Sequence, residues 1–175
     1  MDLKNIGINS FTVKAHDLWA NQWLLLTSGD FSLGKYNTMT VAWGGFGTMW
    51  GKPFAHIVVR PNRYTYQFME EFDDFTLTAF PKAYRSALNL LGTRSGRDGD
   101  KIAESGLTPI PSEIVAAPGF DEAELIVECK KIYKQDMGPQ HFVDPSIDKM
   151  YGGFNYHRIY YGEIVNVLGS DKYMT

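Results

Sequence analysis

Short runs of β-branched and aromatic residues divide the chain, and this division constrains the fold more than any other feature of the sequence. Each run is bounded by Gly, Pro, Asp or Asn, which favour turns. The predicted strands are residues 23–28, 37–44, 54–60, 75–80, 124–133 and 158–168. They arrive in clusters without regular alternation with helices, which favours an antiparallel barrel over a doubly wound parallel sheet.

Three segments between these strands are predicted to be helical. Residues 61–72 open with a proline, which suits the first helical position. KAYRSALNLLG, residues 82–92, has apolar residues at helical spacing and ends at Gly92, as at a helix C-cap. RDGDKIAESG, residues 97–106, is a short third helix. The predicted class is mainly β with helical excursions.

The composition limits the kinds of partner. At 175 residues the chain is long enough for one domain, residues 1–175, with a sizeable core. Its net charge of -3 argues against a nucleic-acid binder. Aromatic residues make up 14% of the chain, more than such a core needs. Some of them are therefore expected to face a partner chain or a planar ligand.

Cysteine usage and hydropathy indicate the compartment. The lone Cys129 rules out an internal disulfide, and its alternating surroundings predict a buried structural thiol. The first ten residues lack the apolar segment of a signal peptide. The uncharged run 36–51 is too short for a membrane span, which takes about 20 apolar residues. We therefore expect a cytoplasmic protein that is not attached to a membrane.

Familiar catalytic motifs are missing. The sequence has no Gly-x-Ser-x-Gly, GGFGTMWG has the wrong spacing for a dinucleotide-binding motif, and GTRSGRDGDK lacks the Gly-Lys-Ser/Thr of a P-loop. The four histidines show no ligand spacing, so no metal site is predicted. The long segment 135–155 is predicted to be a lid, a binding loop or a dimer arm.

Basic residues gather around two predicted helix starts. Eight of the seventeen Lys and Arg fall between Lys52 and Lys101. In VVRPNRYTY a strand delivers Arg60 just before a helix, and in TRSGRDGDK a glycine-rich turn precedes the next helix. Helix N-termini with arginines nearby bind phosphate well. Either a phosphate site or ordinary surface decoration accounts for these residues.

The uncharged stretch YNTMTVAWGGFGTMW, residues 36–50, could form one wall of a flat ligand site. A strand of this kind presents backbone groups and small hydroxyls with apolar side chains between them. A flavin ring is flat, largely apolar and fringed with hydrogen-bonding atoms, and an Arg-rich pocket would hold its phosphate. Flavin chemistry needs few catalytic side chains, which is consistent with the missing motifs.

Five segments, taken in order, resemble the flavin reductase-like family, which has the FMN-binding split-barrel fold and includes flavoredoxins. They are NTMTVAWGG, HIVVRPNRYTYQFMEE, FTLTAF, GTRSGRDGDKIAESGLTP and HRIYYGEIVNV. The resemblance covers residues 23–168, and its most specific parts are Asn-x-Met-Thr and Ser-Gly-x-Asp-x-Asp-Lys. It implies an antiparallel Greek-key barrel, usually a homodimer with FMN near the subunit interface.

The resemblance also assigns roles to residues. The isoalloxazine wall would comprise Asn37, Thr38, Met39, Thr40, Val41, Ala42 and Trp43. The phosphate would be surrounded by Arg60, Arg63, Tyr64, Thr65, Ser95, Gly96, Arg97 and Lys101. His157 matches a histidine that often lies near the flavin or nicotinamide, and it is the catalytic candidate. A packed strand-end histidine is the alternative interpretation.

The function implied is an FMN-binding oxidoreductase that takes hydride from NADH or NADPH. Electrons would pass to free flavin, a redox partner protein or a small acceptor. One alternative is a non-enzymatic FMN electron carrier reduced by a partner protein, and another is a ligand-free barrel used for dimerisation. The Trp- and Gly-rich GGFGTMWGKP and the loop 135–155 favour a covered pocket in which FMN stays bound.

Overall fold

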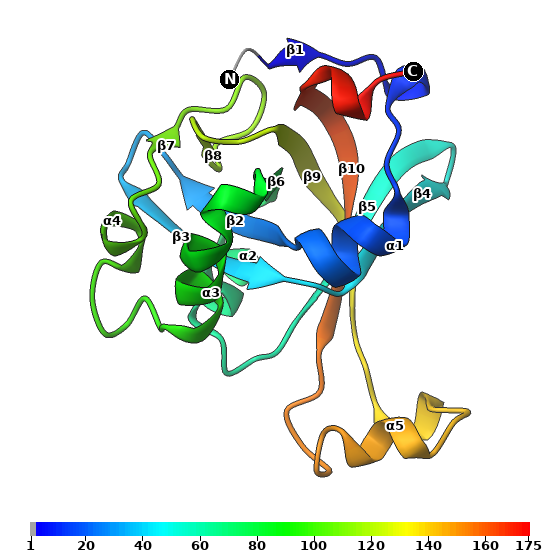
Figure 1. Ribbon diagram of the computed structural model, residues 1–175. Coiled ribbons are helices and arrows are strands. Elements are labelled where there is room, and N and C mark those ends of the chain that lie inside the picture. The colour runs from blue at the N-terminus through cyan, green and yellow to red at the C-terminus, as the bar shows by residue number, and fades with distance from the viewer. Residues whose placement is uncertain (1–2) are drawn as a thin grey trace.

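The computed structural model describes residues 3–175, and a curved antiparallel sheet forms most of it (Figure 1). Its strands are β1 (Lys4–Asn5), β2 (Leu24–Asp30), β3 (Lys35–Val41), β4 (Gly44–Met49), β5 (Lys52–Val59), β6 (Asp74–Ala79), β9 (Leu125–Asp136) and β10 (Arg158–Gly169). A separate two-stranded sheet pairs β7 (Pro109–Ile110) with β8 (Gly119–Phe120).

The order of strands in the large sheet is β3-β2-β6-β9-β10-β5-β4, and β1 pairs with β10 outside this order. β5 and β6 are consecutive in the chain, yet β10 and β9 lie between them, so the connection through α2 (Tyr64–Glu71) crosses over. This Greek-key arrangement confirms the predicted mainly β, antiparallel class. Among the described residues β3 and β4 do not pair, so the barrel is split between them.

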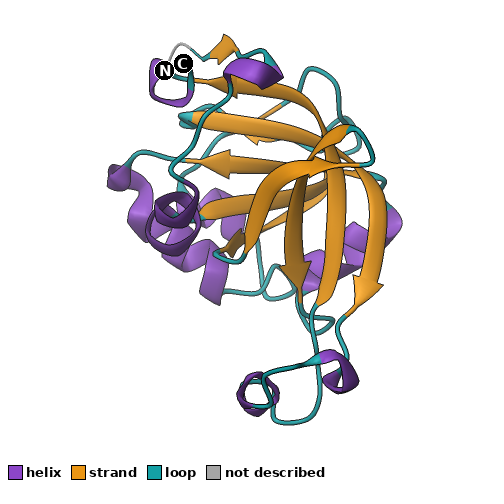
Figure 2. Ribbon diagram, turned by 90° about the vertical axis from the view of Figure 1, so that its right-hand side faces the viewer, coloured by secondary structure: helices purple, strands orange, loops and turns teal. Residues whose placement is uncertain are grey.

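Short helices cover the outside of the sheet beside β2 and β3 (Figures 1 and 2). Those beside these two strands are α2 and α3 (Arg85–Thr93). The other helices are α1 (Ala15–Asp17), which continues into a π-helical turn Leu18–Gln22, α4 (Lys101–Ser105), which packs on α3, and α5 (Ser146–Lys149), which lies away from the barrel. Single 3₁₀ turns occupy Ile8–Ser10, Lys82–Tyr84, Pro139–His141 and Asp171–Tyr173.

β2 is apolar on both of its faces, so its sequence does not alternate between apolar and polar residues. Leu24 and Leu26 face the main core inside the barrel, whereas Leu25 packs in a second apolar cluster beneath α3. A strand covered on both faces is expected to be continuously apolar. Cys129 is fully buried in the main core as a free thiol, as predicted, and burial raises its pKa.

All six predicted strands are present, but β4 and the two-residue strands β1, β7 and β8 were missed. The predicted strand 37–44 ends at Val41, and Gly44 begins β4, which forms a hairpin with β5. Trp50 and Gly51 turn this hairpin with positive φ angles of 55° and 69°. The glycine-rich composition of β4 hid its strand character, since glycine is a poor strand former.

The predicted helix boundaries near the basic segments were wrong. Pro61 does not begin α2, because the chain first makes a turn in which the Arg63 N–H donates to the Arg60 carbonyl at 3.0 Å. Gly92 lies inside α3 and is not its C-cap. The third helix is only Lys101–Ser105, with Asp100 at its N-cap and Gly106 left-handed at its end.

Residues 137–156, here called the arm, extend from the ends of β9 and β10 away from the barrel (Figure 2). The arm carries α5 and an aromatic cluster in which the Tyr151 ring lies 5.8 Å from Phe142 and 5.0 Å from Tyr156. Val143 and Phe154 are largely exposed on it. Within residues 3–175, none of the helices has the length and apolar character needed to cross a membrane.

Candidate functional site

Two adjoining cavities form a groove along β3. The wider one has a volume of about 260 Å³ and the narrower one about 170 Å³. Met39 and Arg63 line both, so the cavities are continuous along this side of the barrel. We call them the wide and narrow ends of the groove.

The wall of the groove follows from the position of β3 at the end of the sheet. β3 pairs with β2 alone, so its outer edge has no strand partner among the described residues. Thr40 donates its hydroxyl to the Leu88 carbonyl at 2.5 Å, which ties α3 to this strand. Asn37 donates to the Thr65 hydroxyl at 2.7 Å and so joins β3 to the first turn of α2.

Two glycines allow the helical segments to approach β3 closely. A Cβ on Gly92 would lie 3.0 Å from the Thr40 Cβ. A Cβ on Gly96 would collide with Oδ1 of Asn37 and would lie 3.0 Å from the Tyr64 ring. Gly92 is therefore a packing residue within α3, and Gly96 lets the loop after α3 close the narrow end.

The narrow end is basic. Its lining includes four cationic side chains and no carboxylate: Arg63, Arg94, Arg97 and Lys101. Arg97 lies over the Tyr64 ring at 4.9 Å and donates to the Asn62 carbonyl at 3.3 Å. Arg63 makes only a long bond of 3.5 Å to the Gly92 carbonyl. Arg94 is paired with Glu104 at 2.7 Å. The guanidinium groups of Arg63 and Arg97 thus have the weakest bonds to the rest of the protein among these cations and are the most available to a ligand.

Lys101 is bound mainly to the protein itself. Its ammonium is buried and donates to the carbonyls of Leu91 at 2.8 Å and Arg94 at 3.1 Å. These are carbonyls at the end of α3, so Lys101 caps that helix from a distant position. Burial and the charge of Arg63 lower the pKa of Lys101 to about 8.

At the wide end, His157 lies beside Trp43 with ring centroids 5.1 Å apart. Its Nδ1 is 2.8 Å from the Tyr151 hydroxyl of the arm. The Arg60 guanidinium lies over the Tyr151 ring at 5.0 Å. Burial, together with the charges of Arg60 and Arg63, lowers the pKa of His157 to about 4. His157 is therefore neutral at neutral pH and can offer a hydrogen bond at Nε2 without adding charge.

This pKa predicts a pH dependence of stability. Since the folded pKa of His157 lies below its ordinary value of 6.5, the unfolded chain takes up the proton first as the pH falls. The stability contribution is present above about pH 6.5 and is lost toward about pH 4. Between about pH 7 and pH 5, wild type should lose about 1–2 kcal/mol more free energy of unfolding than His157→Gln. Urea denaturation at both pH values measures this difference.

The control for this experiment is His16→Gln, which changes an exposed histidine on α1. It should lose as much stability as wild type over the same pH interval. Identical losses in wild type and in His157→Gln would contradict the assigned burial of His157.

The groove brings together almost all of the predicted site residues. Met39, Thr40, Val41, Ala42, Trp43, Arg60, Arg63 and His157 line the wide end. Asn37, Met39, Arg63, Tyr64, Thr65, Ser95, Gly96, Arg97 and Lys101 line the narrow end. Thr38 is the exception, because its buried hydroxyl donates to the Leu26 carbonyl at 3.0 Å inside the barrel. Only its backbone is placed to contribute to the wall.

Sequence reasoning missed other residues at the groove. Asn62 and Arg94 line the narrow end and lie inside the two basic segments already singled out, so that signal could have included them. Tyr151 had no such signal, since it lies far from both segments in the sequence. Trp50 contacts Tyr133 and Tyr161 instead of covering the groove.

The groove lacks carboxylates and metal-binding clusters among the residues that line it. Neither end of the groove is lined by Asp or Glu. Within residues 3–175, no group of three or more His, Cys, Asp or Glu is arranged to hold a metal ion. The groove is thus suited to an anion with an uncharged, flat extension.

Solved structures with the same fold define the class of protein. This chain matches an FMN-binding domain of a flavin reductases-like enzyme from Shewanella baltica OS155 with a TM-score of 0.68 and 16% identity, over 95% of this chain and 76% of that chain. It matches flavoredoxin of Desulfovibrio vulgaris (Miyazaki F) with a TM-score of 0.67 and 25% identity, over 96% and 76%. It matches a flavoredoxin from Methanosarcina acetivorans with a TM-score of 0.67 and 20% identity, over 98% of this chain and 75% of that chain. The fold is therefore that of the split-barrel flavin-binding proteins.

The chain belongs to the flavin reductase-like family, because the model of the flavin reductase like domain matches residues 20–174. This match confirms the resemblance found in the sequence. No curated protein sequence matches the chain.

Proposed function

We propose that the protein is an FMN-dependent oxidoreductase that uses a reduced nicotinamide as electron donor. One observation carries the proposal: a groove whose narrow end holds four cations and no carboxylate continues into an uncharged strand edge. A phosphate fits the first part, and a flat ring with hydrogen-bonding edges fits the second.

The residues present fit FMN part by part. Arg63 and Arg97, with the hydroxyls of Thr65 and Ser95, would hold the phosphate. The backbone and side chains from Met39 to Trp43 would lie along the ring. Bound FMN supplies the redox chemistry, by accepting a hydride and passing electrons on. The protein's task is then to bind, orient and shield the cofactor.

The wide end offers a place for a second planar group. Trp43 is about half exposed at 46% and lies beside His157. A nicotinamide ring could pack against this aromatic surface, and neutral His157 could hydrogen-bond to its carboxamide. Tyr151 holds the His157 ring at Nδ1, so His157 would meet the ligand in one orientation.

The first test is the visible spectrum of the purified protein before and after anaerobic addition of NADH or NADPH. We expect a flavin spectrum that bleaches at about 1 s⁻¹ or faster, within the usual range of enzyme turnover. Stopped-flow absorbance measures the rate. Dithionite serves as the control, because it reduces bound flavin without a nicotinamide site.

The outcomes separate the proposal from its alternatives. Flavin that bleaches with dithionite but not with either nicotinamide would contradict the proposed donor and leave an electron carrier reduced by a partner protein. This alternative is favoured by the likeness to flavoredoxin at 25% identity. Protein that binds no FMN under any condition would contradict the proposal as a whole.

The homodimer and the redox partner protein stay predictions. The arm offers a surface for either, because Val143, Met150 and Phe154 are exposed on it. Through Tyr151 the arm also contacts Arg60 and His157, so a protein bound to the arm would lie close to the groove.

A further inference from the structure

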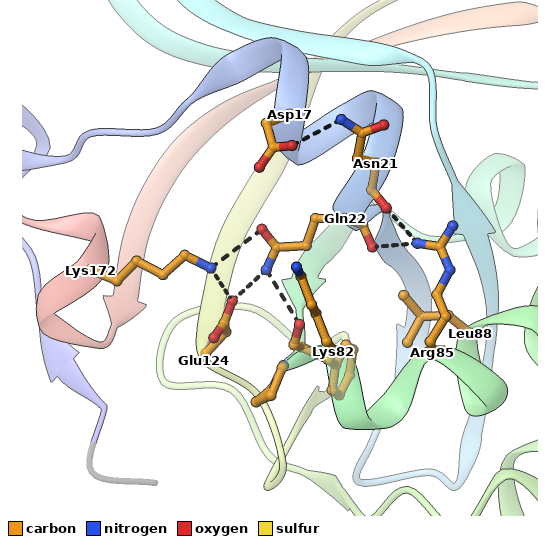
Figure 3. Close-up of a pocket in the computed structure, with 10 residues that line it drawn as sticks. Asp17, Asn21, Gln22, Lys82, Arg85, Leu88, Glu124 and Lys172 are labelled. Carbon is orange, nitrogen blue, oxygen red and sulfur yellow. Dashed lines mark hydrogen bonds and ion pairs between the residues drawn. The ribbon is translucent and has the colours of Figure 1, made fainter.

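A second cavity, larger than either end of the groove, lies at another part of the barrel (Figure 3). Its volume is about 680 Å³, within the range of about 300–1,000 Å³ typical of small-molecule sites. It is enclosed by the π-helical turn Leu18–Gln22, the start of α3 and the C-terminal turn Asp171–Tyr173. The cavity shares no lining residue with the groove.

The floor of this cavity is apolar. Phe80 and Leu88 are almost fully buried beneath it, and Pro81 adds a third apolar surface. An apolar floor stabilises the body of an organic ligand but offers nothing to a bare inorganic ion.

The charges around the floor leave a positive excess. Glu124 is paired with Lys172 at 2.6 Å, and Asp17 accepts a bond from Asn21 at 2.9 Å. The cavity is lined by these two carboxylates and by three cations, which are Lys82, Arg85 and Lys172. The side chain of Lys82 makes no hydrogen bond or ion pair with any residue that the structure describes, and Figure 3 shows it reaching into the cavity.

Arg85 is held rigidly beside Lys82. Its guanidinium lies 3.1 Å from the centre of the Trp23 ring. One nitrogen, Nη1, donates to the carbonyls of Asn21 at 2.5 Å and Gln22 at 3.2 Å. The remaining guanidinium donors have no side-chain or backbone partner among residues 3–175, and the charge of Arg85 lies at the rim of the cavity.

Glu124 provides a hydrogen-bond acceptor on the other side. Burial would raise its pKa, but hydrogen bonds from Lys172 and Tyr173 outweigh burial and lower it, so the carboxylate is charged. Gln22, Lys172 and Tyr173 all donate to Oε1. No hydrogen bond within the described part of the chain ends on Oε2 of this buried residue, which leaves that oxygen for a ligand.

We propose that this cavity binds a small organic carboxylate whose apolar body carries a hydrogen-bond donor. The carboxylate binds to Lys82 and Arg85, the body packs on Phe80 and Leu88, and the donor bonds to Glu124. The inference does not depend on flavin binding, because the two sites have no residue in common.

The test is calorimetric titration of the 175-residue protein with 4-hydroxybenzoate. We expect saturable binding with a Kd at or below about 1 mM. Lys82→Glu should raise the Kd for 4-hydroxybenzoate by a factor of about ten or more. Two controls make the same change in net charge: Lys130→Glu on the exposed part of β9, and Arg97→Glu in the groove. Both should bind within about twofold of wild type.

A second titration tests the role of Glu124. Benzoate lacks the hydroxyl, so its Kd for wild type should be higher than that of 4-hydroxybenzoate by a factor of about three or more. Glu124→Gln keeps the side-chain shape and should reduce this preference, and a thermal melt confirms that the variant is folded. Should it not fold, the preference of wild type alone still decides.

Three results would overturn the proposal. The first is no saturation below about 10 mM. The second is equal weakening by all three charge reversals, which would indicate a general effect of net charge. The third is weakening by Arg97→Glu alone, which would place the anion in the groove. Equal affinity for both probes would overturn the role given to Glu124.

Discussion

The double variant Arg63→Ala with Arg97→Ala is expected to bind FMN about a hundredfold more weakly than wild type, or worse. A hydrogen bond to a charged group contributes about 1.5–3 kcal/mol, and the double variant removes at least two. Neither arginine supports the fold strongly, because Arg63 makes one long bond to Gly92 and Arg97 one bond to Asn62. Fluorescence titration with FMN measures the change.

Riboflavin makes this test specific, since it carries the ring but not the phosphate. The double variant and wild type should bind riboflavin with similar affinity. Lys14→Ala with Lys130→Ala removes the same charge from exposed positions outside the groove and should leave FMN affinity unchanged. If the double arginine variant weakened FMN and riboflavin equally, the phosphate would not lie at the narrow end.

Lys101 was predicted as a phosphate ligand, but the structure makes it a poor choice for that experiment. Its ammonium already binds two carbonyls at the end of α3. Removing it would leave buried carbonyls unsatisfied, so a loss of FMN affinity could reflect a shifted helix. Arg63 and Arg97 avoid this ambiguity.

Glu128→Ala is expected to lower the free energy of unfolding by about 3–5 kcal/mol. Glu128 is fully buried on β9 and accepts backbone N–H bonds from Glu113 at 3.0 Å, Ile114 at 2.7 Å and Val115 at 3.1 Å. A fourth bond comes from Asn166 at 3.0 Å. Alanine would leave the three backbone N–H groups without an acceptor inside the protein, whereas Asn166 would keep its bond to the Glu113 carboxylate at 3.0 Å.

Urea denaturation of Glu128→Ala, Glu128→Gln and wild type measures this effect. Glutamine keeps the shape and one acceptor oxygen but loses the charge, so it should cost less than alanine. Glu122→Ala is the control, because Glu122 is less buried and accepts a backbone bond from Thr108 alone. A loss below about 1 kcal/mol for Glu128→Ala would contradict this account.

Much of the fold could be predicted because strands leave a local signal. Val127 and Cys129 alternate with Glu128, and this period of two identifies β9 whatever the rest of the chain does. The same pattern, however, predicts that Glu128 faces water. Glu128 is buried because the loop 112–117 folds over it. The sequence of β9 does not indicate the position of that loop.

The candidate site shows the same division. The basic segments around Arg63 and Arg97 are visible in the sequence, because charge clusters and glycines are local features. The sequence does not show that these two segments meet in one groove. Their meeting depends on Gly96, which lets the loop after α3 approach Asn37 of β3. Tyr151 reaches His157, six residues later, through the turn that leads from the arm into β10, where Gly152, Gly153 and Asn155 have positive φ angles.

The sequence by itself determined the strand runs, the buried thiol of Cys129, the two basic segments and the family. Those features depend on residues that are neighbours in the chain or on motifs preserved in order. The tertiary structure alone decided which cations remain free, which carboxylate is buried and where the cavity beside Glu124 opens. Such properties arise from contacts between distant segments, and desolvation and pairing at those contacts determine whether a charge binds the protein or a ligand.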